Sequence, residues 1–207
     1  MISILQTYSI MLLRSLGYTL ILTVLALVFA MIIGLIFALC NVSRIKVLNI
    51  LGTIYVDAIR GVPLIVLAFF IYFGIPQAFR LLGINNFRLP ALQAGTIALS
   101  MNCGAYMAEI FRAGIQSIDK GQMEASRSLG LSYSTTMKCV ILPQAFRTMM
   151  PSIINQFIIS LKDTSLISII GIRELTQNGK IIAANSASMV MAIWLVVAAF
   201  YLVICTI

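Results

Sequence analysis

Long uncharged segments alternate with short charged ones along the whole chain. Between Arg14 and Arg44 there are 29 residues without a charge. As an α-helix this segment would be about 43 Å long, enough to cross a hydrocarbon core of about 30 Å. Comparable segments follow, and the pattern predicts about five membrane-crossing helices. They are expected at residues 15–40, 50–75, 90–113, 143–170 and 187–207.

Composition agrees with an all-α, polytopic membrane protein that forms a single transmembrane domain over residues 1–207. The chain is 61% hydrophobic and 10% charged, with a mean hydropathy of +1.06. It has no histidine, the commonest general base and metal ligand, so we expect neither catalysis nor a metal site. The four cysteines lie far apart without a CxxC pair, and we expect no disulfide.

The net charge of +8 comes from scattered lysines and arginines, which indicates membrane topology and not nucleic-acid binding. With the N-terminus outside, the loops near 41–49 and 112–147 are cytoplasmic. Seven basic residues then lie inside: Arg44, Lys46, Arg112, Lys120, Arg127, Lys138 and Arg147. Five lie outside: Arg14, Arg80, Arg88, Arg173 and Lys180. This bias is weak, so the orientation needs other support.

The two ends of the chain carry expectations of their own. The first apolar segment is too long for a cleaved signal, and we expect it to stay as a helix. The sequence stops at Ile207 inside an apolar run, so we expect the natural chain to continue beyond it.

Small residues recur at a spacing of four in the first predicted span, at Ala26, Ala30, Gly34 and Ala38. Such a stripe lets a neighbouring helix approach closely. We therefore expect tight helix packing along this face.

A polar insert, Gly121–Pro143, interrupts the apolar pattern. Asp119 followed by Gln122 predicts a capping box, and Gly130 is typical of the residue after a helix, so residues 120–129 should be helical. Ser132 can cap a second helix. The resulting helix–Gly–helix hairpin lies in a predicted cytoplasmic loop at about 114–142. Its apolar residues between charges suit helix-in-groove binding to a partner.

Pro143 marks the end of the insert. Proline favours the first turn of a helix, and we expect the fourth span to begin there.

The insert resembles the EAA loop of ABC-importer permeases, through Glu124-Ala125-Ser126, Gly130 and Ile141-Leu142-Pro143. Further stretches resemble the polar-amino-acid branch of these permeases: GYTLILT, RGVPLIV, NCGAYMAEIFRAGIQSI and LKDTSLISIIGIREL. Ser126 replaces the second alanine of the pattern, and Val62 stands where threonine is frequent. Both differences are small.

The resemblance implies the fold of a type I importer permease in a bacterial cell membrane, with a coupling helix that docks on a separate ATPase subunit. The residues implied in coupling are Gln122, Glu124, Ala125, Arg127, Gly130, Leu142 and Pro143. The chain has no G-x-x-x-x-G-K-[ST] motif, so ATP and Mg²⁺ are expected on the partner chain and no cofactor on this one. Other implied partners are a second permease copy or close paralogue, a second ATPase subunit, an extracellular or periplasmic amino-acid-binding protein and membrane lipid.

Polar residues inside the predicted spans are the candidate substrate site, because a charge in the bilayer is costly. Two stripes follow helical spacing, one with Asn102, Tyr106 and Glu109, the other with Ser152, Gln156, Ser160 and Asp163. We expect substrate contacts from Asn102, Tyr106, Glu109, Asp163 and Thr164. The alternative is that these groups only hold helices together.

Asp57 and Arg60 lie three residues apart and can neutralise each other. Gly61 and Pro63 should break or kink the second span, so Arg60, Gly61 and Pro63 are predicted to act in gating or packing.

The sequence thus favours the permease subunit of an ATP-driven amino acid importer that works by alternating access. Glutamine is the expected substrate, with cystine or a basic amino acid as close rivals. The alternative is a membrane channel or scaffold subunit without ATP coupling, which would explain the polar stripes or the composition but not the capped hairpin.

Overall fold

The structure is a computed structural model of the 207-residue chain, and it describes residues 2–43 and 45–206. Arg44, counted above among the cytoplasmic basic residues, lies outside the described residues. Within the described ranges every regular element is helical and no strand is present, which confirms the all-α prediction. In chain order the helices are α1 (Ile2–Val42), α2 (Lys46–Gly61), α3 (Leu64–Phe69), α4 (Ile75–Leu81), α5 (Ala91–Gln116), α6 (Lys120–Ser128), α7 (Tyr133–Thr136), α8 (Leu142–Ile167), α9 (Leu175–Asn185) and α10 (Val190–Thr206).

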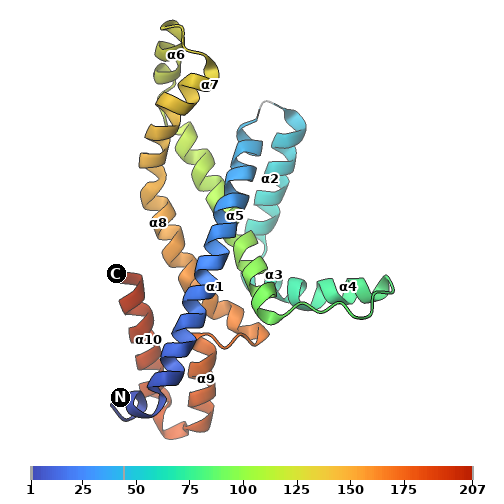
Figure 1. The fold of residues 1–207 in the computed structure, drawn as a ribbon, viewed down its shortest axis with the longest axis vertical. Helices are drawn as coiled ribbons and strands as arrows, with labels where there is room; N and C mark the ends of the chain where they lie inside the picture. Colours follow the sequence, from blue (N-terminus) through green and yellow to red (C-terminus); the bar gives the residue numbers. More distant parts are fainter. Residues whose placement is uncertain (1, 44, 207) are drawn as a thin grey trace.

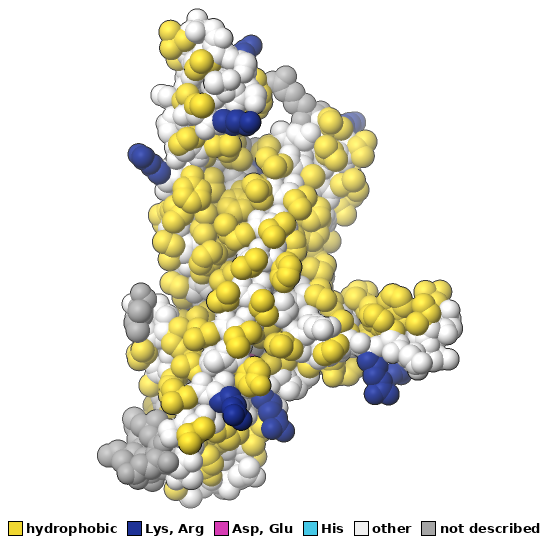
Figure 2. Space-filling model, viewed as in Figure 1, with side chains coloured by type: hydrophobic (Ala, Val, Ile, Leu, Met, Phe, Trp, Pro, Cys, Tyr) yellow, Lys and Arg dark blue, Asp and Glu magenta, His cyan; other side chains and the backbone are white. Residues whose placement is uncertain are grey.

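Three helical stretches are long and apolar enough to cross a membrane: Thr7–Val42, Leu64–Leu81 and Tyr133–Ile170. Val190–Thr206 is a shorter apolar helix. Hydrophobic side chains cover the middle of the face drawn in Figure 2, while lysines and arginines lie toward the two ends. This distribution is typical of a bundle whose sides meet lipid.

The longest helix, α1, packs along α5 as the small-residue stripe predicts. Ala26, Ala30 and Ala38 are fully buried. A Cβ added to Gly34 would lie 2.5 Å from the Cβ of Met107, so only glycine allows α5 to approach this closely. The predicted close packing is confirmed.

The predicted break in the second span is confirmed: the chain leaves helical geometry after α2, so residues 50–75 do not form one continuous helix. Val62 is extended, with φ −106° and ψ 130°, and Pro63 follows before α3 begins. Proline disfavours helical geometry at the preceding residue, and β-branched Val62 accepts the extended form easily. The following segment, Leu64–Leu81, packs in the bundle core through Leu64, Leu67, Ala68 and Ile71, and its α4 end projects sideways (Figure 1). We call this segment the arm.

Two other prolines are crossed without a break. Before Pro76 the Ile75 amide donates to the Phe70 carbonyl, and before Pro143 the Leu142 amide donates to the Met137 carbonyl. Both bonds span five residues and form π turns, η1 (Phe70–Gly74) and η2 (Met137–Ile141). The wider turn accommodates a proline ring, which would clash with the carbonyl four residues back. Pro143 lies in the first turn of α8, which begins at Leu142, as predicted for the start of the fourth span; helical backbone also precedes it through α7 and η2.

The α6–α7 hairpin and the α1–α2 connection lie at one end of the molecule, and α9 and the N-terminus lie at the other (Figure 1). The predicted topology requires the two connections on one side, and the structure confirms this. We call the hairpin end the cytoplasmic end and the α9 end the outer end.

Candidate functional site

Three separate parts of the chain line one cavity of about 550 Å³ in the bundle. The break after α2 contributes Arg60, Gly61 and Pro63. Helix α5 contributes Asn102 and Tyr106, one turn apart, and α8 contributes Gln156 and Asp163, two turns apart. The cavity therefore unites residues predicted for substrate contact with residues predicted for gating.

Arg60 reaches across the cavity to α5. Its guanidinium carbon lies 5.2 Å from the centroid of the Tyr106 ring, within the range of a cation–π contact. Among the described residues Arg60 forms no ion pair with Asp57, so the predicted mutual neutralisation is absent. The guanidinium thus lies beside the cavity, over the Tyr106 ring.

Polar groups of both signs surround the same space. Asp163 supplies a partly buried carboxylate, and Asn102 and Gln156 supply amide groups that are buried within the bundle. The Gln156 Nε2 also lies 3.9 Å from the Cys103 Sγ, a contact that positions the side chain against α5. A cation, an anion and neutral amides around one cavity can match a zwitterion, because each charged end finds an opposite partner.

Two predicted substrate residues lie elsewhere. Glu109 forms an ion pair with Arg112 and lines a neighbouring cavity of about 400 Å³ toward the cytoplasmic end, together with Asp57 and Arg60. It lies seven residues beyond Asn102 on α5, and this distance along the helix moves it past the first cavity. Thr164 is fully buried, and its hydroxyl donates to the Leu161 carbonyl oxygen at 2.6 Å. Neither residue lines the cavity that holds Asn102.

Gln156 lines the cavity but was not singled out from the sequence. It belongs to the polar stripe of the fourth span, and its seven-residue distance from Asp163 places the two side chains on one face of α8. That spacing could have identified Gln156 as a site residue. Charged residues drew more attention in the sequence, because burying a charge costs more free energy than burying a neutral amide.

The cytoplasmic hairpin is built from local hydrogen bonds. The Asp119 carboxylate accepts from the Gly121 amide at 2.6 Å at the start of α6. Gly130 has φ +83°, its amide donates to the Arg127 carbonyl, and the Leu131 amide donates to the Ser126 carbonyl. These two bonds form a Schellman motif, which confirms the predicted role of Gly130.

The second half of the predicted capping box is absent. The Gln122 side chain does not return to Asp119 and instead accepts from the Gln144 Nε2 at 3.5 Å. Ser132 caps α7 as predicted, accepting from the Thr135 amide at 3.1 Å.

All seven predicted coupling residues lie on the surface: Gln122, Glu124, Ala125, Arg127, Gly130, Leu142 and Pro143. Ser126 is buried on the opposite side of α6, and its hydroxyl donates to the Gln122 carbonyl at 2.7 Å. Serine can therefore replace alanine in the EAA pattern, because it is small and its hydroxyl finds a partner in its own helix.

The chain matches the family described as "Binding-protein-dependent transport system inner membrane component" over residues 30–207. It is 42% identical over 187 residues to the glutamine transport system permease protein GlnP of Escherichia coli, covering 90% of this chain and 82% of the relative. It is also 42% identical over 188 residues to the L-cystine transport system permease protein TcyB of Bacillus subtilis, covering 91% and 77%. The chain belongs to the polar amino acid ABC transporter permeases.

Solved structures agree with this membership. A structure titled "Crystal structure of an amino acid ABC transporter with histidines" superimposes with a TM-score of 0.89 at 37% identity, covering 99% of this chain and 92% of the other. The MetNI methionine transporter, at 21% identity and a TM-score of 0.74, shares the fold. The chain is thus a non-catalytic, multi-pass permease of the bacterial inner membrane. Its family works with ATPase subunits and a binding protein.

Proposed function

We propose that this permease forms the translocation path of an importer for a polar, zwitterionic amino acid. One observation carries the proposal: a single cavity brings the guanidinium of Arg60 and the carboxylate of Asp163 together with the Asn102 and Gln156 amides. Arg60 would bind the substrate carboxylate and Asp163 its ammonium group. The relatives named for glutamine and cystine transport support glutamine as substrate, with cystine or a basic amino acid as the next candidates.

The site is interior, where a charged substrate must exchange water for protein partners. Buried amides at Asn102 and Gln156 suit an uncharged polar side chain such as that of glutamine, because they both donate and accept hydrogen bonds. Glu109 and Arg112 lie in the next cavity toward the cytoplasm, where they would meet a substrate that leaves the site.

Coupling would run through α6. Two copies of this permease, or one copy and a close paralogue, would stand above two ATPase subunits that bind ATP and Mg²⁺. The exposed face of α6 would dock in a groove of the ATPase, and its movement would rock the helices between outward-facing and inward-facing states. A capped, rigid helix transmits such a displacement without bending.

The test is uptake of labelled glutamine, cystine and arginine by the complete transporter in proteoliposomes. Asp163→Asn should lower uptake roughly tenfold, because the ammonium group loses a charged partner. The matched control Asp163→Glu changes the same residue but keeps its charge, and it should retain more uptake than Asp163→Asn. Unchanged uptake with Asp163→Asn at every substrate concentration would assign that residue a packing role and remove the proposed site.

A further inference from the structure

The arm is apolar and exposed from Phe70 onward. Phe70, Phe73 and Leu81 are each more than half exposed. The arm is long and apolar enough to cross a membrane, but its α4 end runs across the long axis of the bundle (Figure 1). In Figure 2 hydrophobic side chains cover much of this projection, and basic ones lie below it, toward the outer end. An element of this kind lies in the plane of the membrane interface, with apolar side chains in the acyl region.

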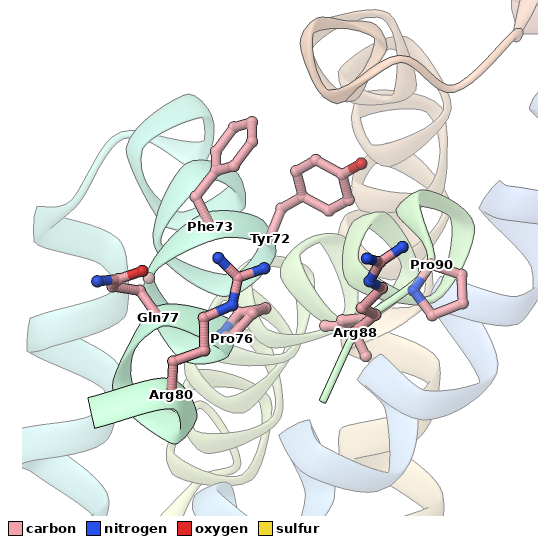
Figure 3. Close-up of a pocket in the computed structure, with 9 residues that line it drawn as sticks. Tyr72, Phe73, Pro76, Gln77, Arg80, Arg88 and Pro90 are labelled. Atoms are coloured by element: carbon pink, nitrogen blue, oxygen red, sulfur yellow. The ribbon is translucent and has the colours of Figure 1, made fainter. Parts of the chain in front are cut away.

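A pocket of about 800 Å³ opens between the arm and the segment that leads into α5. Arg80 of α4 and Arg88 of that segment both line it. Their guanidinium groups and the Tyr72 hydroxyl point to the same side of the ribbon (Figure 3). Apolar residues supply much of the remaining lining: Phe73, Pro76, Leu89 and Pro90. The pocket therefore combines two cations with an apolar wall, and the boundary between lipid headgroups and acyl chains offers the complement of both.

The two arginines are held in place but have no anionic partner. The rings of Phe79 and Phe87, each one residue before an arginine, stack with centroids 4.4 Å apart. Among the residues that the structure describes, no ion pair, side-chain hydrogen bond or ring contact engages either guanidinium. Two like charges in one pocket repel each other, and an anion between them would remove this repulsion. A guanidinium presents paired N–H donors that match the oxygens of a phosphate.

An apolar groove of about 460 Å³ begins close to this pocket. It lies between α1 and α5, and its apolar lining consists of Leu25, Phe29, Ile33, Leu92, Ile97 and Met101. Two hydroxyls in the groove are satisfied within α5, since Thr96 donates to the Leu92 carbonyl and Ser100 donates to the Thr96 carbonyl. Pro90 lines the pocket and Leu92 lines the groove, so the two linings come within about 7 Å of each other along the chain. From there the groove follows α5 toward the middle of the bundle.

We propose that the pocket and the groove together bind one anionic phospholipid of the leaflet at the outer end. Its phosphate lies between Arg80 and Arg88, and one acyl chain lies in the groove between α1 and α5. A free phosphate ion would match the arginines but would leave the apolar wall and the groove uncovered. The proposal concerns the membrane around the permease and does not depend on which substrate is transported.

A second copy of this chain does not supply the missing anion. Of the six acidic residues, all within the described part of the chain, Glu174 alone lies at the outer end, and it is fully buried. The others lie in the membrane helices or the hairpin: Asp57, Glu109, Asp119, Glu124 and Asp163. The exposed charged residues at the outer end are basic: Arg14, Arg80, Arg88, Arg173 and Lys180. A copy with the same orientation in the membrane would therefore bring more positive charge to the pocket.

The experiment measures lipid binding to the complete transporter by native mass spectrometry. Phosphatidylglycerol, which is anionic, and phosphatidylcholine, which is zwitterionic, are added in detergent with the same acyl chains. Arg80→Gln with Arg88→Gln should weaken phosphatidylglycerol binding about tenfold, while phosphatidylcholine binding changes less than about twofold. Arg80→Lys with Arg88→Lys keeps both charges and should restore most of the phosphatidylglycerol binding.

Ile97→Trp tests the groove, because Ile97 is partly exposed and a larger ring there can fill the space without entering the core. It should weaken binding of both lipids to a similar extent, since it removes contact with the acyl chain and no charge. The matched control for the arginines is Arg14→Gln with Arg173→Gln, which removes the same charge from the same end but outside the pocket. It should change phosphatidylglycerol binding less than about twofold.

Three results would overturn the proposal in different ways. Equal loss of phosphatidylglycerol in the two glutamine double variants would mean that only the overall positive field attracts lipid, and no loss in either would remove the site. Displacement of phosphatidylglycerol by excess inorganic phosphate, with no effect of Ile97→Trp, would show a simple anion site. Loss of a second permease copy from the Arg80→Gln, Arg88→Gln transporter, measured by light scattering with lipid binding unchanged, would assign the pocket to an interface between copies.

Discussion

Helices α6 and α9 each begin after an acidic residue whose carboxylate caps the helix, but one carboxylate is exposed and the other is buried. Asp119, at the cytoplasmic end, is exposed and accepts one hydrogen bond from Gly121, two residues away. Glu174, at the outer end, is fully buried and accepts from the Thr176 and Gln177 amides at 2.9 and 2.7 Å. It also accepts from the Tyr201 hydroxyl on α10 at 3.0 Å.

The two helix starts also differ in how they are connected to the rest of the bundle. The Leu175 amide donates to the Thr19 hydroxyl of α1 at 3.1 Å, so the start of α9 is joined to both α1 and α10. The hairpin, by contrast, closes mainly on itself through Gly130 and Ser132. A helix with local caps can present its outer face to a partner, whereas a helix capped through buried long-range bonds holds the bundle together.

The largest expected effect on stability comes from replacing Glu174. Glu174→Ala would leave two amides and a tyrosine hydroxyl without their acceptor, and we expect it to destabilise the fold by about 3 kcal/mol. Asp119→Ala, the matched change at the exposed cap, should cost about 1 kcal/mol. Melting temperatures of the two purified variants in detergent measure the difference. Equal losses would mean that burial does not separate the two caps.

The next effect concerns the hairpin turn. Gly130→Val places a β-branched residue at φ +83° and should strain the turn by about 2 kcal/mol, misaligning α6. We expect the purified permease to lose its ATPase subunit while the bundle still folds. Gly83→Val is the control, because it strains the same kind of turn at φ +86° on the outer side. Retention of the ATPase by Gly130→Val would argue against coupling through α6.

A smaller effect is a pH dependence from Glu174, which lies outside the membrane-crossing helices. Burial raises the pKa of its carboxyl above the ordinary value, and the hydrogen bonds from the Thr176 and Gln177 amides only partly oppose this. The folded protein thus binds this proton more tightly than the unfolded chain. The resulting stability is fully present below the unfolded pKa, about 4.3, and is lost as the pH rises through the folded pKa.

Glu174→Gln keeps the shape of the side chain but removes its titration. Between about pH 4.5 and pH 8, the melting temperature of wild type should fall relative to that of Glu174→Gln. Parallel curves for the two proteins would show that the carboxyl titrates alike in the folded and unfolded states.

The candidate site was partly predictable. Helical spacing indicated that Asn102 and Tyr106 share a face, and the cost of a charge in the bilayer drew attention to Asp163. Nothing in the sequence indicated that Arg60 would contact Tyr106 rather than Asp57, because that choice depends on where the break at Val62 points the end of α2. Glu109 lines a different cavity from Asn102, and its spacing could not show this, because spacing gives the face of a helix but not how far along it a neighbouring helix reaches.

The sequence by itself determined what is local. The lengths of the uncharged segments predicted most of the membrane helices. Asp119 and Gly130 predicted the start and end of α6. The small residues spaced four apart predicted the face of α1 that meets α5. Only the tertiary structure decided what depends on several elements at once. It turned the α4 end of the arm out of the bundle, joined Arg60 and Asp163 in one cavity, buried Glu174 against Tyr201 and set Arg80 beside Arg88. Caps, turns and periodic faces arise from neighbours within a few residues, whereas cavities and buried hydrogen bonds depend on segments whose relative position is settled only when the helices pack.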